Sequence, residues 1–114
     1  MPYISVNVSS TLKEDDKERL KAKLGETIAV IPGKTEAVTM VSITDSCALY
    51  MGGRPLVKGA FIETRIYGTA EKTHKENYVK ALFAAMEDVL GYPKEDIYIN
   101  FLELESWGLN GRMV

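Results

Sequence analysis

The sequence predicts an α+β fold built from a duplicated βαβ unit (βαββαβ), with a four-stranded mixed sheet and two helices on one face of that sheet. Segments with strand patterning and segments with helical periodicity follow one another in the order strand, helix, strand, and then in the same order again. The two halves align at an offset of 59 residues, which places 14–31 over 73–90 and indicates an internal duplication. A chain of 114 residues is sufficient for a single domain, which we place at 1–114.

The first strand is predicted over residues 2–8, where Ile4, Val6 and Val8 alternate with Tyr3, Ser5 and Asn7 in the period of a half-buried strand. Thr11 is expected to cap the following helix, because Glu14 comes three residues later and completes a capping box.

The first helix is predicted over 12–31 and is ended by Pro32-Gly33. Its apolar residues recur at helical spacing and are Leu20, Leu24, Ile28 and Ile31. The second strand is marked by Val38, Met40, Val41 and Ile43. A short apolar piece at 49–51 follows and is ended by the turn sequence Gly52-Gly53-Arg54-Pro55.

The second unit begins with a strand predicted over about 57–67 and closed by Gly68. A second amphipathic helix is predicted over 73–90 and is terminated by Gly91-Tyr92-Pro93. A last strand over 97–104 leads into a tail rich in Gly and Asn.

One sheet face is expected to lack a cover within the chain. Right-handed βαβ crossovers place both helices on the same face. The last strand nevertheless carries apolar side chains on both sides, with Tyr98, Leu102 and Leu104 opposite the set that begins at Ile97. A lone sheet would therefore expose apolar surface, which favours oligomerisation.

Charge and cysteine content exclude several classes of partner and site. The 14 basic and 16 acidic residues nearly cancel and form no block of like charge, so neither nucleic acid nor an anionic membrane is an expected partner. Cys47 is the only cysteine, which excludes an intrachain disulfide and a cysteine-based metal cluster. The first thirty residues hold no uninterrupted apolar segment, so we expect a cytoplasmic protein without a signal peptide or membrane span.

Pro2 is the most informative single residue. It directly follows the initiator methionine, so removal of Met1 would leave an N-terminal secondary amine. An α-amino group titrates near 7.7 to 8.0, and desolvation or a neighbouring cation favours its neutral form. A general base works best with a pKa near the operating pH, so Pro2 is a candidate base.

Several motifs together resemble the tautomerase superfamily, and within it the macrophage migration inhibitory factor and D-dopachrome tautomerase branch. They are Pro2, the duplicated βαβ unit, Gly33-Lys34, Tyr98-Ile99-Asn100 and Trp107-Gly108-Leu109-Asn110-Gly111. The resemblance covers essentially the whole chain. It implies a tautomerase-like homotrimer whose sheets surround a central channel, with three active sites at the subunit boundaries and no cofactor or metal.

The resemblance also assigns roles to residues. Pro2 takes the place of the catalytic base and Lys34 that of the cation that binds the substrate carboxylate. Tyr67 stands where a backbone N–H also holds this carboxylate. Tyr98 and Asn100 match pocket residues donated by the neighbouring subunit, while Trp107 and Leu109 match the apolar wall.

Some residues depart from the family pattern or keep a simpler interpretation. Val38 replaces a pocket tyrosine and Leu109 replaces a tryptophan. The C-terminal tail is shorter and ends at Met113-Val114 without the terminal aromatic residue, and the Cys-x-x-Cys pair is missing from the chain. Taken alone, Lys34 reads as a solvated lysine at a helix end, and Tyr98 as a packed aromatic. His74 is interpreted as a surface residue, and Arg54 as solvated or as a second carboxylate contact at the pocket mouth.

These inferences favour a cofactor-independent keto–enol tautomerase acting on phenylpyruvate-like 2-oxo acids. Pro2 would move the proton and Lys34 would hold the carboxylate, whereas Tyr98 and Asn100 are alternatives for a donor to the oxyanion or a contact to an aryl ring. The first alternative is a signalling protein that binds a receptor and has a vestigial pocket. Hydrolytic dehalogenation or decarboxylation, and a ferredoxin-like binding module, are the others.

Overall fold

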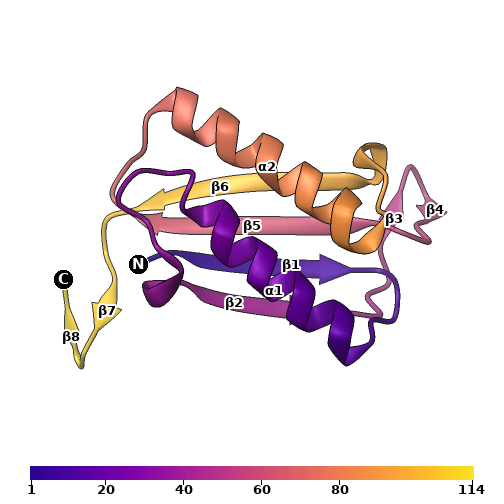
Figure 1. Cartoon of the computed structure of the whole chain (residues 1–114), viewed down its shortest axis with the longest axis horizontal. Coiled ribbons are helices and arrows are strands. Elements are labelled where there is room, and N and C mark those ends of the chain that lie inside the picture. The colour runs from indigo at the N-terminus through magenta and orange to yellow at the C-terminus, as the bar shows by residue number, and fades with distance from the viewer.

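A computed structural model describes all residues from 1 to 114 and has the predicted order of strands and helices (Figure 1). The main elements are β1 (Tyr3–Val8), α1 (Glu14–Ile28), β2 (Met40–Thr44), β5 (Ala60–Tyr67), α2 (Lys72–Leu90) and β6 (Ile97–Leu104). Two short 3₁₀ helices, η1 (Glu36–Val38) and η2 (Lys94–Asp96), precede β2 and β6. Two small hairpins complete the chain, formed by β3 (Tyr50–Met51) with β4 (Arg54–Pro55) and by β7 (Gly108–Leu109) with β8 (Arg112–Met113).

The central sheet has four strands in the order β2-β1-β5-β6. The outer pairs are parallel and the central pair, β1 with β5, is antiparallel. Tyr3 pairs with Met40 and Ala60 pairs with Ile97, so partners have the same sequence separation in both halves. Both helices lie on one face of the sheet (Figure 1). The predicted α+β class, with a mixed four-stranded sheet and both helices on one face, is therefore confirmed.

The core lies between this face and the two helices. Ile4, Val6 and Val8 of β1 are fully buried, which confirms the alternation seen in the sequence. Both helices contribute fully buried side chains to the same cluster, namely Leu20, Leu24, Ile28, Tyr78, Leu82 and Met86. Burial of each large apolar side chain contributes about 1.5–3 kcal/mol, so this layer is the main source of stability.

The start of α1 differs from the prediction. Glu14 is the first helical residue and Lys13 is the N-cap, whose backbone N–H donates to Asp16 Oδ2 at 3.2 Å. Thr11, predicted as the cap, instead shares a 2.9 Å hydrogen bond with Ser46 Oγ. Three acidic residues in the first turn favour this boundary, because negative charge is stabilising at a helix N-terminus.

Two strand boundaries also differ. The strand predicted from about residue 57 begins at Ala60, and Val57 is 81% exposed while its carbonyl accepts hydrogen bonds from Ser9 and Ser10. The tail, described only as rich in Gly and Asn, forms the β7–β8 hairpin. Its turn residues Asn110 and Gly111 have φ of 52° and 80°, the left-handed conformation that an Asn-Gly hairpin turn requires.

The second sheet face carries exposed apolar side chains, as expected. Met40 is 70% exposed and Tyr98 is 62% exposed, although both belong to strands of the central sheet. Exposed apolar surface of this kind is typical of interfaces. The homotrimer that would cover it stays a prediction. Neither helix has the length and hydropathy needed to cross a bilayer.

Candidate active site

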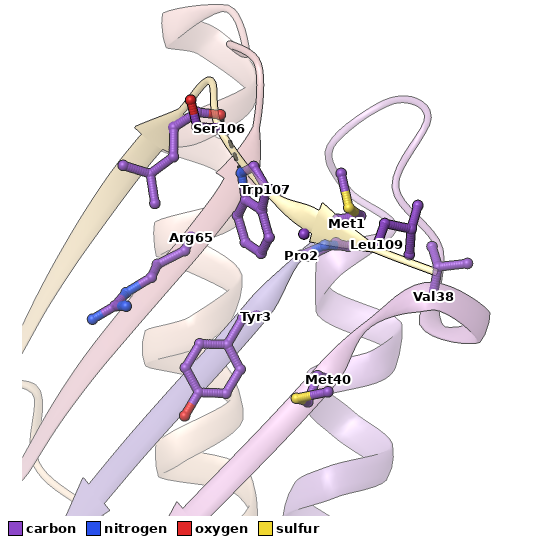
Figure 2. A pocket seen from close by; sticks show the side chains of 11 residues that line it. Met1, Pro2, Tyr3, Val38, Met40, Arg65, Ser106, Trp107 and Leu109 are labelled. Atoms are coloured by element: carbon purple, nitrogen blue, oxygen red, sulfur yellow. Dashed lines mark hydrogen bonds between the residues drawn. The ribbon is translucent and has the colours of Figure 1, made fainter. Parts of the chain in front are cut away.

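A cavity of about 540 Å³ opens at the end of the sheet where β1 begins and β6 ends. Segments far apart in the sequence meet there, as Figure 2 shows. The cavity is mainly apolar, and its lining consists of Met1, Pro2, Tyr3, Val38, Met40, Arg65, Leu104, Ser106, Trp107, Gly108 and Leu109.

Pro2 is buried and lies directly before the first residue of β1. Its carbonyl accepts a 3.0 Å hydrogen bond from the Met40 N–H, which extends the β1–β2 pairing by one position and fixes the proline. With Met1 present, the Pro2 nitrogen is an amide. Burial, and secondly the charge of Lys34, hold the pKa of the Met1 α-amino group below its ordinary value of 8.0.

Lys34 lies just beyond α1, where its backbone N–H donates to the Ile31 carbonyl at 3.1 Å. Its Nζ donates to the Tyr67 carbonyl at 3.3 Å, so the ammonium is held against the end of β5. Lys34 thus contacts Tyr67, and its charge acts on the amine at the chain start. Neither Lys34 nor Tyr67 is among the residues that line the cavity of this chain. The contact observed for Tyr67 uses its carbonyl oxygen, whereas the resemblance assigned a role to its N–H.

Trp107 and Leu109 form part of the cavity wall, in agreement with the sequence analysis. The indole Nε1 of Trp107 donates to the Leu104 carbonyl at 3.2 Å, which orients the ring. The Val114 N–H donates to the Trp107 carbonyl at 2.9 Å, so the hairpin at the end of the chain holds the same residue. Figure 2 shows the indole beside Pro2.

Tyr98 and Asn100 share the open face of β6, as their spacing predicted, and do not line the cavity of this chain. Asn100 Nδ2 donates to Glu63 Oε1 at 3.4 Å on the neighbouring strand. Their placement in the pocket of an adjacent subunit stays a prediction.

Arg65 is a cavity residue that sequence reasoning missed. Its Nη2 lies 3.3 Å from Glu63 Oε2, and its guanidinium carbon lies 5.9 Å from the centre of the Tyr3 ring. The aliphatic stem contributes to the wall while the guanidinium points away from Pro2 (Figure 2). The available signal was its position two residues before Tyr67, which places both on the open face.

Other candidates lie elsewhere. Arg54 is in the β3–β4 hairpin at the opposite end of the sheet and pairs with Asp96 at 3.6 Å, so its suggested contact at this cavity is wrong within the chain (Figure 1). His74 lies in the first turn of α2, 3.9 Å from Glu71, on the surface. No group of three or more His, Cys, Asp or Glu side chains converges on a metal-sized site.

Comparisons with known proteins agree with this fold. The family model described as macrophage migration inhibitory factor matches residues 1–114. Among solved structures, Leishmania major MIF2 has 23% identity and a TM-score of 0.90, covering 100% of this chain and 97% of that one. The macrophage migration inhibitory factor-like protein of Entamoeba histolytica has 20% identity and a TM-score of 0.87, with 99% and 98% coverage.

A native fused 4-OT has 19% identity and a TM-score of 0.85, covering 96% of this chain and 94% of its own. A search of proteins with curated functions finds no match.

Proposed function

The chain belongs to the macrophage migration inhibitory factor family, and from this premise we propose that it is a cofactor-independent keto–enol tautomerase of phenylpyruvate-like 2-oxo acids. The observation that carries the proposal is the geometry at the chain start: buried Pro2 lines a cavity, and a lysine held by the Tyr67 carbonyl lies near enough to act on the terminal amine. A tunable base and an adjacent cation are what this reaction requires.

Removal of Met1 converts the Pro2 nitrogen into a secondary amine. In the ketone-to-enol direction, this amine takes a proton from C3 of the substrate, and the released C–H electron pair forms the C2–C3 double bond. The carbonyl π electrons move to oxygen, which accepts the proton from the Pro2 ammonium to give the enol and restore the free amine. The reverse reaction returns the proton from the Pro2 ammonium to C3, so no oxidant, reductant or bound group is consumed.

The surroundings of the chain start would favour a neutral, basic Pro2 amine. Burial, and secondly the Lys34 ammonium, lower the pKa of the Met1 α-amino group. Removal of Met1 would leave the amine on Pro2, which is itself buried, so we expect both effects to lower its pKa toward neutral pH, where a general base is most effective.

Lys34 would bind the substrate carboxylate and stabilise the negative charge that gathers on the enolate oxygen. The substrate side chain would lie against Trp107, Leu109, Val38 and Met40, which make this wall apolar. Because such a wall discriminates between related hydrocarbon groups by only about 1–3 kcal/mol, it suits a class of 2-oxo acids.

We further propose that the active form is a homotrimer, in which Tyr98 and Asn100 of one subunit complete the neighbouring cavity. Exposure of both side chains on the open sheet face supports this arrangement. Sedimentation equilibrium should give three times the 12.7 kDa chain mass, and a monomer would contradict it.

The decisive experiment uses protein whose intact mass verifies loss of Met1. Conversion of phenylpyruvate enol to ketone, followed by absorbance, should be fast for this protein and at least about 100-fold slower for Pro2→Ala, since general bases contribute 10²–10⁴-fold. Pro55→Ala, in the exposed β3–β4 hairpin, is the matched control and should keep full activity. Full activity of Pro2→Ala, or an inactive wild type with a free Pro2 amine, would overturn the proposal.

A further inference from the structure

The connection between β5 and α2, residues 68–71, follows the point where the Lys34 ammonium contacts β5. It starts directly after Tyr67, whose carbonyl accepts the Lys34 ammonium. The Gly68 N–H donates to the Leu104 carbonyl at 3.1 Å, which ties the first residue of the connection to the end of β6. The carbonyl that holds Lys34 Nζ thus belongs to the last residue of β5, directly before a short segment with no regular structure of its own.

Glu103 of β6 makes the second tie. Its Oε2 accepts the Ala70 N–H at 2.7 Å, and its Oε1 accepts Lys75 Nζ at 2.9 Å. One carboxylate thus bridges the connection and the first turn of α2. Its side chain is 26% exposed, and that of Lys75 is 30% exposed, so both are partly shielded from solvent.

Glu103 and Leu104 together form one anchoring point for two parts of the site. The Leu104 carbonyl accepts hydrogen bonds from both Gly68 and the Trp107 indole. Glu103, the preceding residue, fixes the connection two residues further on, at Ala70. Two hydrogen bonds from β6 therefore hold the connection that directly follows the Tyr67 carbonyl, one at Gly68 and one at Ala70.

We propose that Glu103 is a positioning residue for substrate binding, acting through the Ala70 N–H to hold the 68–71 connection and thereby the Lys34 ammonium. This inference rests on the proposed function, because Lys34 is taken as the carboxylate-binding cation. Glu103 itself would not touch the substrate, because its two carboxylate oxygens are already engaged by the Ala70 N–H and by Lys75 Nζ.

Three variants separate this role from ordinary stabilisation by the Glu103–Lys75 ion pair. Glu103→Ala removes both contacts. Glu103→Gln keeps a carbonyl oxygen for the Ala70 N–H but removes the charge opposite Lys75. Lys75→Met keeps the carboxylate and its bond to Ala70 while deleting the ammonium. Glu105→Ala, the next acidic residue along the chain and exposed, is the control.

The kinetic readout is KM and kcat for a 2-oxo acid. Glu103→Ala should raise KM about tenfold, because a displaced cation binds the substrate carboxylate less well, and should also lower kcat, because the same cation stabilises the enolate oxygen. Glu103→Gln, Lys75→Met and Glu105→Ala should keep a KM close to that of wild type. An unchanged KM in Glu103→Ala, or an equal rise in Lys75→Met or Glu103→Gln, would overturn the positioning role.

A binding experiment tests the role without catalysis. The probe is 3-phenylpropanoate, a carboxylate that has no 2-oxo group, titrated into labelled protein and followed by amide resonances. Glu103→Ala should weaken its binding about tenfold and shift the amides of Tyr67 and Gly68, by the same loss of positioning. Unchanged binding and unchanged amides would refute the role of Glu103, whereas an inactive wild type that binds the probe through Lys34 would refute only the proposed reaction.

Discussion

The buried hydrogen bond between Thr64 and Tyr78 gives the sharpest test of how the sheet that carries the site is held to α2. The two hydroxyl oxygens lie 2.7 Å apart, and both residues are 0% exposed. Burial raises the pKa of Tyr78 well above its ordinary value, so the phenol stays protonated and keeps its donor at working pH. Thr64 lies in β5, directly before Arg65 and two residues after the fully buried Ile62. Its hydrogen bond to Tyr78 therefore supports the strand that ends at Tyr67.

Replacing either partner leaves the other hydroxyl without this bond, in a place that water does not reach. An unsatisfied buried donor or acceptor costs about 1–3 kcal/mol, so Tyr78→Phe and Thr64→Val should each lower the free energy of unfolding by that amount. The double variant removes both hydroxyls together, and its loss should be smaller than the sum of the single losses by about 1–2 kcal/mol.

Urea unfolding followed by circular dichroism, for all four proteins at one concentration, measures this coupling. A fixed concentration is necessary because association would otherwise change the apparent stability. Additive losses, within about 0.3–0.5 kcal/mol, would show that the two hydroxyls are satisfied independently and would refute the argument.

Three further predictions concern the site, the acid response and the helix ends. Lys34→Met should raise KM about 10–100-fold, since a hydrogen bond to a charged group contributes about 1.5–3 kcal/mol. It should also move the ascending limb of the pH–rate profile to higher pH, because loss of the nearby cation raises the pKa of the terminal amine. The control is Lys58→Met, which changes an exposed lysine just before β5 and should have neither effect. The Lys75 ammonium and then the Ala70 N–H hold the pKa of Glu103 below its ordinary value of 4.5, so the stabilisation is present above that pH and lost as pH falls through the lower folded pKa. The melting-temperature difference between wild type and Glu103→Gln should therefore shrink on acidification, and a constant difference would contradict this sign. Gly91→Ala should lower the free energy of unfolding, measured in urea, by about 1 kcal/mol, because Gly91 has φ of 68°. Gly25→Ala should be neutral or stabilising by up to ~1 kcal/mol, because the three atoms nearest to the added methyl group all belong to the exposed Glu36 side chain, which can move aside.

Elements with strong periodicity were predictable from the sequence. The alternation of Ile4, Val6 and Val8 gave the correct buried face of β1, because period-two burial is intrinsic to a strand against a core. The end of α1, predicted at residue 31, is wrong, because the helix ends at Ile28. Ile31 keeps helical spacing and is only 2% exposed, which misled the prediction. Ile31 lies in the turn after the helix and is buried there, so it continues the apolar spacing of the helix as if the helix had one more turn.

Contacts between segments that are distant in the sequence could not be predicted from local sequence patterns. Thr11 satisfied the capping rule, but its hydroxyl is engaged by Ser46, a residue that only tertiary folding brings near. Arg65 reads as one charged residue in a strand, and its place in the cavity depends on Tyr3 pairing with it across β1 and β5. The tail hairpin, in contrast, had a local signal in Asn110-Gly111 that went unused.

Pro2 and Trp107 come from nearly opposite ends of the sequence, yet they share one cavity wall. During synthesis, the segment that supplies Ser106 to Leu109 is made after β1 and after all the strands and helices between them, so this cavity forms only after the rest of the sheet has been made. Contacts between residues so far apart in the sequence also form late in refolding, because the entropy lost on closing the loop between them is offset only once the intervening strands are paired. Core assembly and the gain of catalytic competence should accordingly be separable in time, with recovery of activity lagging behind recovery of the circular dichroism signal.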